Sequence, residues 1–112
     1  MPPNTPTHNF QVVTYLAKTS SGFPERELRR CEAYAHAFNW DIALIVVDDE
    51  VDAKGPERRP LLQAALQRLL DNRAGAILVP SRSAISPIEG EFNEFAERVE
   101  KASDFIQVAT RR

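Results

Sequence analysis

The 112-residue sequence has little of several features that mark whole classes of protein. It contains one cysteine, Cys31, so it forms no internal disulfide and no cysteine-rich zinc site. Its longest apolar run, Ile42 to Val47, is far shorter than the roughly 20 residues of a membrane helix. It has four glycines and no glycine-rich loop after its first predicted strand, which argues against a P-loop or dinucleotide site. We therefore expect a cytoplasmic protein that does not contact a membrane.

The charges are nearly balanced, with 14 basic and 16 acidic side chains and a net charge of −2. Such a chain has little non-specific attraction for a polyanion, so any contact with nucleic acid would have to be local. The length allows one compact core. Residues 1–9 contain three prolines and no apolar period, which predicts a flexible N-terminal arm before a single domain at residues 10–112.

Short apolar runs alternate with amphipathic segments along residues 10–112. Strands are expected at residues 12–16, 42–47, 76–79 and 105–109, and helices are expected to start at Pro24, Pro60 and Pro87. Strands joined by crossover helices pair in parallel, with helices on the faces. The sequence therefore predicts a small α/β domain, a three-layer α/β/α fold with a mainly parallel sheet of four to five strands.

The spacing of apolar residues also predicts which faces are buried. The run from Ile42 to Val47 is nearly all aliphatic, as is typical of a strand covered on both faces. Each helix is expected to bury one stripe. The stripes are Leu28, Cys31, Ala35 and Phe38 in the first helix, Leu61, Leu62, Ala65, Leu66, Leu69 and Leu70 in the second, and Ile88, Phe92, Phe95, Ala96 and Val99 in the third.

Ligands of parallel sheets bind at the loops beyond the carboxyl ends of the strands. Here those loops carry serines and cations: Lys18 and Ser20 after the first strand, Arg59 after a polar loop that we expect to be mobile, and Arg82 after the third strand. Neither histidine lies in these loops. Arginine matches phosphate oxygens, whereas a serine in acyl transfer needs a positioned base, so the pattern favours a phosphate ligand.

The same residues resemble the N-terminal catalytic domain of the serine recombinases, the resolvase and invertase family. The stretch from Tyr15 to Ser20, "YLAKTS", is similar to the family's motif of an aromatic residue close before Ala-Arg-x-Ser, and Ser20 falls on the nucleophile. The block "ERRPLLQAALQRLLDNRAGAILV" is similar to the segment in which Arg59 would match an active-site arginine. The resemblance runs from about Val12 to Val108.

The resemblance implies an activity. The family's serine attacks a DNA phosphodiester, forms a phosphoseryl link and releases a 3′ hydroxyl, with arginines neutralising the phosphate and without metal or cofactor. Carried over, Ser20 is the nucleophile, and Lys18, Arg59 and Arg82 are the residues that bind the DNA phosphate. Such a transition state needs positioned positive charge and an in-line nucleophile.

Three departures from the motif predict an impaired or inactive site. Lys18 replaces an arginine; Ser81 replaces an aspartate, and Ile85 replaces the second arginine of the motif around Arg82. The loss of one preorganised charge typically lowers the rate about 100-fold or more. The sequence also ends at Arg112, before the family's long dimerising helix and helix-turn-helix domain.

The favoured hypothesis is therefore a resolvase-like domain that acts as an interaction or regulatory module, as a homo-oligomer or with a protein partner, and that binds DNA weakly. The alternatives are an active serine recombinase, whole or truncated, and an unrelated α/β domain that binds an anion or nucleotide. Each residue also has a structural interpretation. Ser20 can belong to a turn, Arg59 to a charge cluster at a helix start, and Arg82 to a surface ion pair with Asp48 or Asp49.

Overall fold

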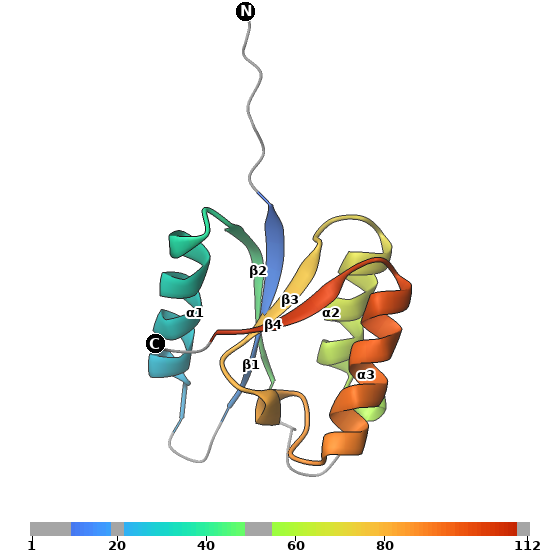
Figure 1. Ribbon diagram of the computed structural model, residues 1–112. Coiled ribbons are helices and arrows are strands. Elements are labelled where there is room, and N and C mark those ends of the chain that lie inside the picture. Colours follow the sequence, from blue (N-terminus) through green and yellow to red (C-terminus); the bar gives the residue numbers. More distant parts are fainter. Residues whose placement is uncertain (1–9, 19–21, 49–54, 110–112) are drawn as a thin grey trace, which may run out of the picture.

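Strands and helices alternate along the chain in the computed structural model, which describes residues 10–18, 22–48 and 55–109 (Figure 1). The predicted N-terminal arm lies outside the described residues. The elements are β1 (Gln11–Ala17), α1 (Glu25–Ala37), β2 (Asp41–Asp48), the 3₁₀ helix η1 (Pro56–Arg58), α2 (Pro60–Leu70), β3 (Ala76–Val79), the 3₁₀ helix η2 (Arg82–Ala84), α3 (Glu89–Lys101) and β4 (Phe105–Val108).

The described strands form one parallel sheet in the order β2-β1-β3-β4. Helix α1 covers one face of this sheet, and α2 and α3 cover the other (Figure 1). A helix after each of β1, β2 and β3 carries the chain back to the end of the sheet where the strands begin. The next strand therefore runs in the same direction, and the strands pair in parallel. The predicted three-layer α/β/α architecture with a parallel sheet is therefore confirmed.

Two apolar clusters hold the layers together, because successive side chains of β1 point to opposite faces. Val13 and Tyr15 belong to the cluster that includes buried residues of α2 and α3, such as Leu66 and Phe95. On the other face, residues of β1 and α1 share the second cluster: Val12, Leu16, Cys31 and Ala35. Burial raises the pKa of the Cys31 thiol to about 12, so this cysteine behaves as a small apolar core residue.

The expectation that Ile42 to Val47 is covered on both faces is confirmed only in part: Leu44 and Val46 contact the first cluster and Ile42 and Val47 the second, but the cover is incomplete. This segment belongs to β2, which lies at an edge of the described sheet and pairs with β1 alone. Val46 is buried and Ile42, Leu44 and Val47 are half-buried, whereas Ala43 and Ile45 are exposed. A long apolar run thus marks the strand itself, while its place in the sheet depends on pairing between distant segments.

The predicted helical stripes are confirmed in part. In α1, Cys31 and Ala35 are buried, but Phe38 lies just past the helix and is exposed. The buried residues of α2 are Leu62, Ala65, Leu66 and Leu69, whereas Leu61 and Leu70 flank this stripe and are exposed. Ile88 is exposed as well, because α3 starts at Glu89, two residues after the predicted start at Pro87. The spacing of apolar residues therefore predicted buried stripes that included exposed residues at their margins.

Candidate functional site

The carboxyl ends of the parallel strands lie together at the lower edge of the domain in Figure 1. The Lys18 amide donates a 2.7 Å hydrogen bond to the Asp48 carbonyl, which ties the ends of β1 and β2 to each other. The Lys18 side chain is exposed at this edge. Ser20 and Asp49 lie outside the described residues, so the nucleophile stays a prediction.

A buried polar network lies beneath this edge. The Tyr15 hydroxyl donates a 2.7 Å hydrogen bond to Asp48 Oδ2. Arg59 Nη1 donates to the Ala84 carbonyl at 3.0 Å and to Tyr15 Oη at 3.4 Å. Tyr15, Asp48 and Arg59 are all buried. The network therefore joins β1, β2, the start of α2 and η2 at one point.

Arg59, which the resemblance assigns to the DNA phosphate, is buried within this network, and its role in phosphate binding stays a prediction. It stands between η1 and Pro60, the first residue of α2, and its side chain is only 1% exposed. The extended backbone at this position, with φ −106° and ψ 106°, is the one that a following proline favours. The alternative of a solvated charge cluster is wrong for Arg59, although its neighbours Glu57 and Arg58 are exposed.

No role was predicted from the sequence for the Tyr15 hydroxyl, which belongs to the buried network of the candidate site. Tyr15 was named only as the aromatic residue of the first strand and its motif, and its ring belongs to the core cluster. Burial, and next the hydrogen bond to Asp48, raise the pKa of the Tyr15 phenol above its ordinary value. The available signal was a tyrosine inside an apolar strand, together with an acid at the end of another strand.

The segment after β3 contains the third predicted group of site residues. The Arg82 guanidinium lies 4.5 Å from the centre of the Phe92 ring, an arrangement typical of a cation–π contact. The hydroxyls of Ser81 and Ser83 are 2.9 Å apart and share a hydrogen bond. Ile85 is fully buried in the core cluster that contains Tyr15 and Phe95. The alternative of an Arg82–Asp48 ion pair is not supported, since no such contact is found between these two described residues.

Comparison with known proteins places this geometry in a fold family. The N-terminal catalytic domain of TP901-1 integrase superposes with a TM-score of 0.74 at 18% identity, covering 88% of this chain and 76% of that one. The C-terminal catalytic domain of ISC1926 TnpA, an IS607-like serine recombinase, gives a TM-score of 0.75 at 15% identity, covering 92% and 69%. The chain has the fold of a serine recombinase catalytic domain. No protein-family model matches the sequence, and no curated protein matches it.

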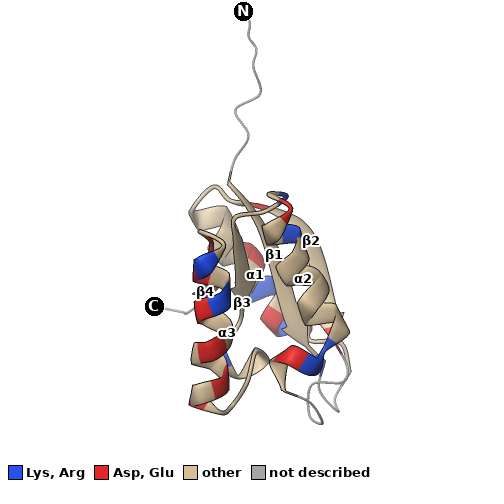
Figure 2. Cartoon of the chain, turned by 90° about the vertical axis from the view of Figure 1, so that its right-hand side faces the viewer, with Lys and Arg blue, Asp and Glu red and all other residues tan. Residues whose placement is uncertain are grey.

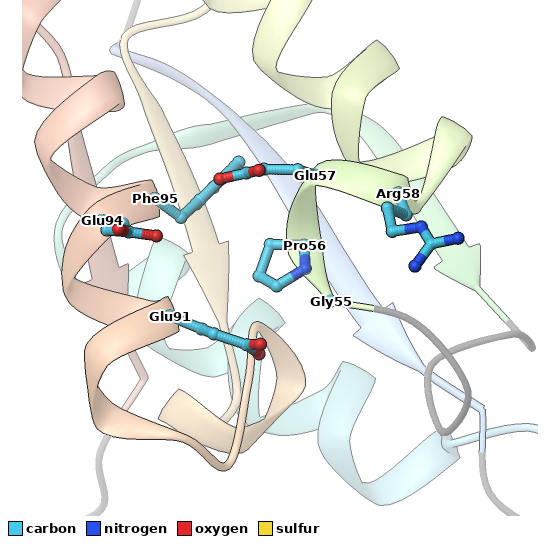
Figure 3. Close-up of a pocket in the computed structure, with 7 residues that line it drawn as sticks. All are labelled: Gly55, Pro56, Glu57, Arg58, Glu91, Glu94 and Phe95. Atoms are coloured by element: carbon cyan, nitrogen blue, oxygen red, sulfur yellow. The ribbon is translucent and has the colours of Figure 1, made fainter.

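Within this recombinase fold, two hollows lie near the candidate site. A shallow one, of about 410 Å³, is lined by Arg82, Ser83 and Phe92 among others. The second, of about 220 Å³, lies between η1 and α3 (Figure 3). Its charged lining is mainly acidic, from Glu57, Glu91 and Glu94, and Arg58 is its one basic residue. The second hollow is therefore unsuited to a phosphate.

Acidic residues also follow the outer face of the recombinase fold at this edge. In Figure 2 the first turns of α3 are red, and basic residues appear toward its other end. The sequence of the helix agrees, with Glu89 and Glu91 in the first turn and Arg98 and Lys101 in the last. This order complements the helix dipole and stabilises α3, but it places negative charge beside the strand ends.

Two further properties concern the described residues only. They contain no group of three or more His, Cys, Asp or Glu side chains arranged to hold a metal ion. None of their helices combines the length and the apolar character needed to cross a bilayer.

Proposed function

We propose that the domain is a serine-recombinase-like module that does not cleave DNA and acts by binding another protein chain. The observation that carries this proposal is the burial of Ile85. The resemblance expects an arginine at this position, but the isoleucine is fully buried in the core cluster. A buried apolar residue offers no charge to a phosphoryl-transfer transition state.

The rest of the segment after β3 supports the same conclusion. Ser81 stands where the motif has an aspartate, and its hydroxyl is engaged with Ser83. Arg82 retains its charge, but its guanidinium packs over Phe92. One of the two expected arginines thus remains in this segment, and the expected carboxylate is absent from it.

The charge distribution argues for weak binding of DNA. The chain has a net charge of −2, and Glu89 and Glu91 open α3 beside the strand ends. A duplex brings closely spaced phosphates to any protein that it contacts, so these carboxylates would repel it. Without strong DNA binding, a protein partner or a second copy of the chain in the cytoplasm is the better candidate.

An active recombinase is the second candidate, and the exposed Lys18 favours it. Lys18 directly follows β1 and Arg82 follows the neighbouring strand β3, so both cations would be available to a phosphate bound at these strand ends. In this reaction the Ser20 hydroxyl would lose its proton and bond to the phosphorus. The bond from phosphorus to the 3′ oxygen would break, and that oxygen would take up a proton and leave as a hydroxyl.

Covalent capture of DNA distinguishes the two candidates. The full chain and its Ser20→Ala variant are incubated with supercoiled and nicked plasmid, and the products are separated under denaturing conditions. We expect no protein–DNA adduct from either protein, with matching circular dichroism spectra showing that both are folded. An adduct formed by the wild type and lost in Ser20→Ala would overturn the proposal. The second part of the proposal is that the domain binds another protein chain. Sedimentation equilibrium of the full chain tests this part, because a module of this kind should associate with itself or with a partner.

A further inference from the structure

Five aromatic side chains contact one another where strands β1, β2 and β4 begin, at the end of the sheet opposite the candidate site. We call this group the aromatic edge. Its members come from three separate segments and are Phe10, Tyr34, Phe38, Trp40 and Phe105. Neighbouring rings have centroids 4.8 to 6.1 Å apart. The rings therefore form one continuous surface and are not scattered exposed residues.

Much of this surface faces solvent in the described part of the chain. Phe10 is 39% exposed, Phe38 is 55% exposed and Phe105 is 37% exposed. The rings of Phe10 and Phe105 stack at 9° with centroids 5.8 Å apart. The Phe10 ring also lies directly over Gly75, where an added Cβ would be 2.4 Å from it. A contiguous exposed apolar patch on a small domain is typical of a binding surface.

The chain itself supplies a segment that fits this surface. Residues 1–9, "MPPNTPTHN", lead directly into Phe10 and contain Pro2, Pro3 and Pro6 and no Lys, Arg, Asp or Glu. Proline-rich segments favour the polyproline II conformation, and surfaces lined by aromatic rings are what bind it. Nine residues in this conformation span about 28 Å, at about 3.1 Å per residue. This length is greater than the 4.8 to 6.1 Å between neighbouring ring centroids, so the segment is long enough to contact several rings.

Two further features favour this occupant. Asp104 directly precedes Phe105, and its Oδ2 is buried without a hydrogen-bond partner among the described residues. Desolvation raises the pKa of this carboxyl, so it would gain from a donor such as a backbone amide or a threonine hydroxyl. A tethered segment also has a high effective concentration at the surface, so it competes well with free peptides.

We propose that residues 1–9 bind the aromatic edge of the same molecule, with prolines packed against the Phe38 and Trp40 rings. This surface lies at the other end of the strands from the candidate site, so its occupancy does not depend on whether the domain cleaves DNA. The docked segment would cover the exposed rings, and any partner of this edge would have to displace it.

Nuclear magnetic resonance of the full chain tests the proposal through the proline side chains. Protons above an aromatic ring are shifted upfield, so the δ protons of at least one of Pro2, Pro3 and Pro6 should lie upfield of their random-coil positions. Phe38→Ala should return them toward those positions. Phe23→Ala is the matched control, because Phe23 is equally exposed but makes no ring contact among the described residues. The control should leave the shifts unchanged.

Fluorescence of Trp40 gives an independent measurement, because it is the only tryptophan in the chain. A variant of the full chain with Pro2→Ala, Pro3→Ala and Pro6→Ala should show a red-shifted emission maximum and stronger quenching by acrylamide than the wild type. Random-coil proline shifts in the wild type would overturn the proposal. Upfield shifts that vanish on dilution would also overturn it, since they would mean that the segment binds a second copy.

Discussion

The Tyr15 hydroxyl and the Asp48 carboxylate form a 2.7 Å hydrogen bond inside the domain, between neighbouring strands β1 and β2. Both residues are buried, and Arg59 approaches the same hydroxyl at 3.4 Å. This contact lies directly beneath the strand ends, where the sequence predicts the phosphate-binding residues. The network thus fixes the floor of the candidate site, and its stability can be measured without knowing a ligand.

Replacing Tyr15 with phenylalanine should destabilise the fold. The change keeps the ring in the core and removes one donor to the buried Asp48 carboxylate. We expect the free energy of unfolding in urea to fall by about 1 to 3 kcal/mol. Tyr34→Phe is the control, because Tyr34 is only half-buried, and it should change stability by less than about 0.5 kcal/mol. Equal effects of the two substitutions would contradict the assignment.

Stability should also fall at alkaline pH. Burial, and then the hydrogen bond to Asp48, raise the pKa of Tyr15 in the folded state above the unfolded value of about 10. The folded chain then holds this proton more tightly than the unfolded chain. The resulting stabilisation is present below about pH 10 and is lost as the pH rises further. Urea unfolding of Tyr15→Phe should show a shallower loss over this range, and an identical slope would count against the raised pKa.

Arg59 and Arg58 are adjacent arginines with opposite environments. Arg59 is buried and donates to the Ala84 carbonyl at 3.0 Å, whereas Arg58 is exposed. We expect Arg59→Ala to lower the free energy of unfolding by about 2 to 3 kcal/mol, because a buried carbonyl and hydroxyl lose their charged partner. Arg58→Ala should stay within about 0.5 kcal/mol of the wild type. Thermal unfolding of both variants checks this, and the reverse order would refute the burial of Arg59.

Substitutions of Gly75 and Gly90 with alanine allow a second matched comparison. An added Cβ at Gly75 would be 2.4 Å from the Phe10 ring, whereas Gly90 has open space around it. We expect Gly75→Ala to displace Phe10, lower the melting temperature and change the emission of Trp40, whose ring contacts Phe10. Gly90→Ala lies in the first turn of α3 and should stabilise the chain by up to about 0.5 kcal/mol, less than in the middle of a helix. Unchanged emission in Gly75→Ala would argue against the packing of Phe10.

The sequence predicted the order of the elements well, because local signals encode it. Pro60 begins α2, and the 3.6-residue period of Leu62, Leu66 and Leu69 marks its buried face. The position of β2 at the sheet edge could not be predicted, since the run from Ile42 to Val47 reads the same at an edge and at the centre. That difference is set by which distant segments pair.

The candidate site was predicted less completely than the fold. The resemblance identified Arg59, but its contact with Tyr15 depends on how α2 packs against β1, and no local pattern reports that. Ile85 was identified from the sequence as a departure from the motif, and the structure adds that its side chain is buried in the core and offers no charge to the site. Ser20 lies outside the described residues, so its role stays a prediction.

The central claim is that position 85 has become part of the core and no longer serves the site. Urea unfolding of Ile85→Arg tests it most directly, with Ile85→Val as the control of similar shape. Because an unpaired charge would be buried, we expect Ile85→Arg to lose several kcal/mol or to fail to fold, while Ile85→Val loses about 0.5 to 1.5 kcal/mol. An Ile85→Arg chain as stable as the wild type, and able to form an adduct with DNA through Ser20, would contradict the account.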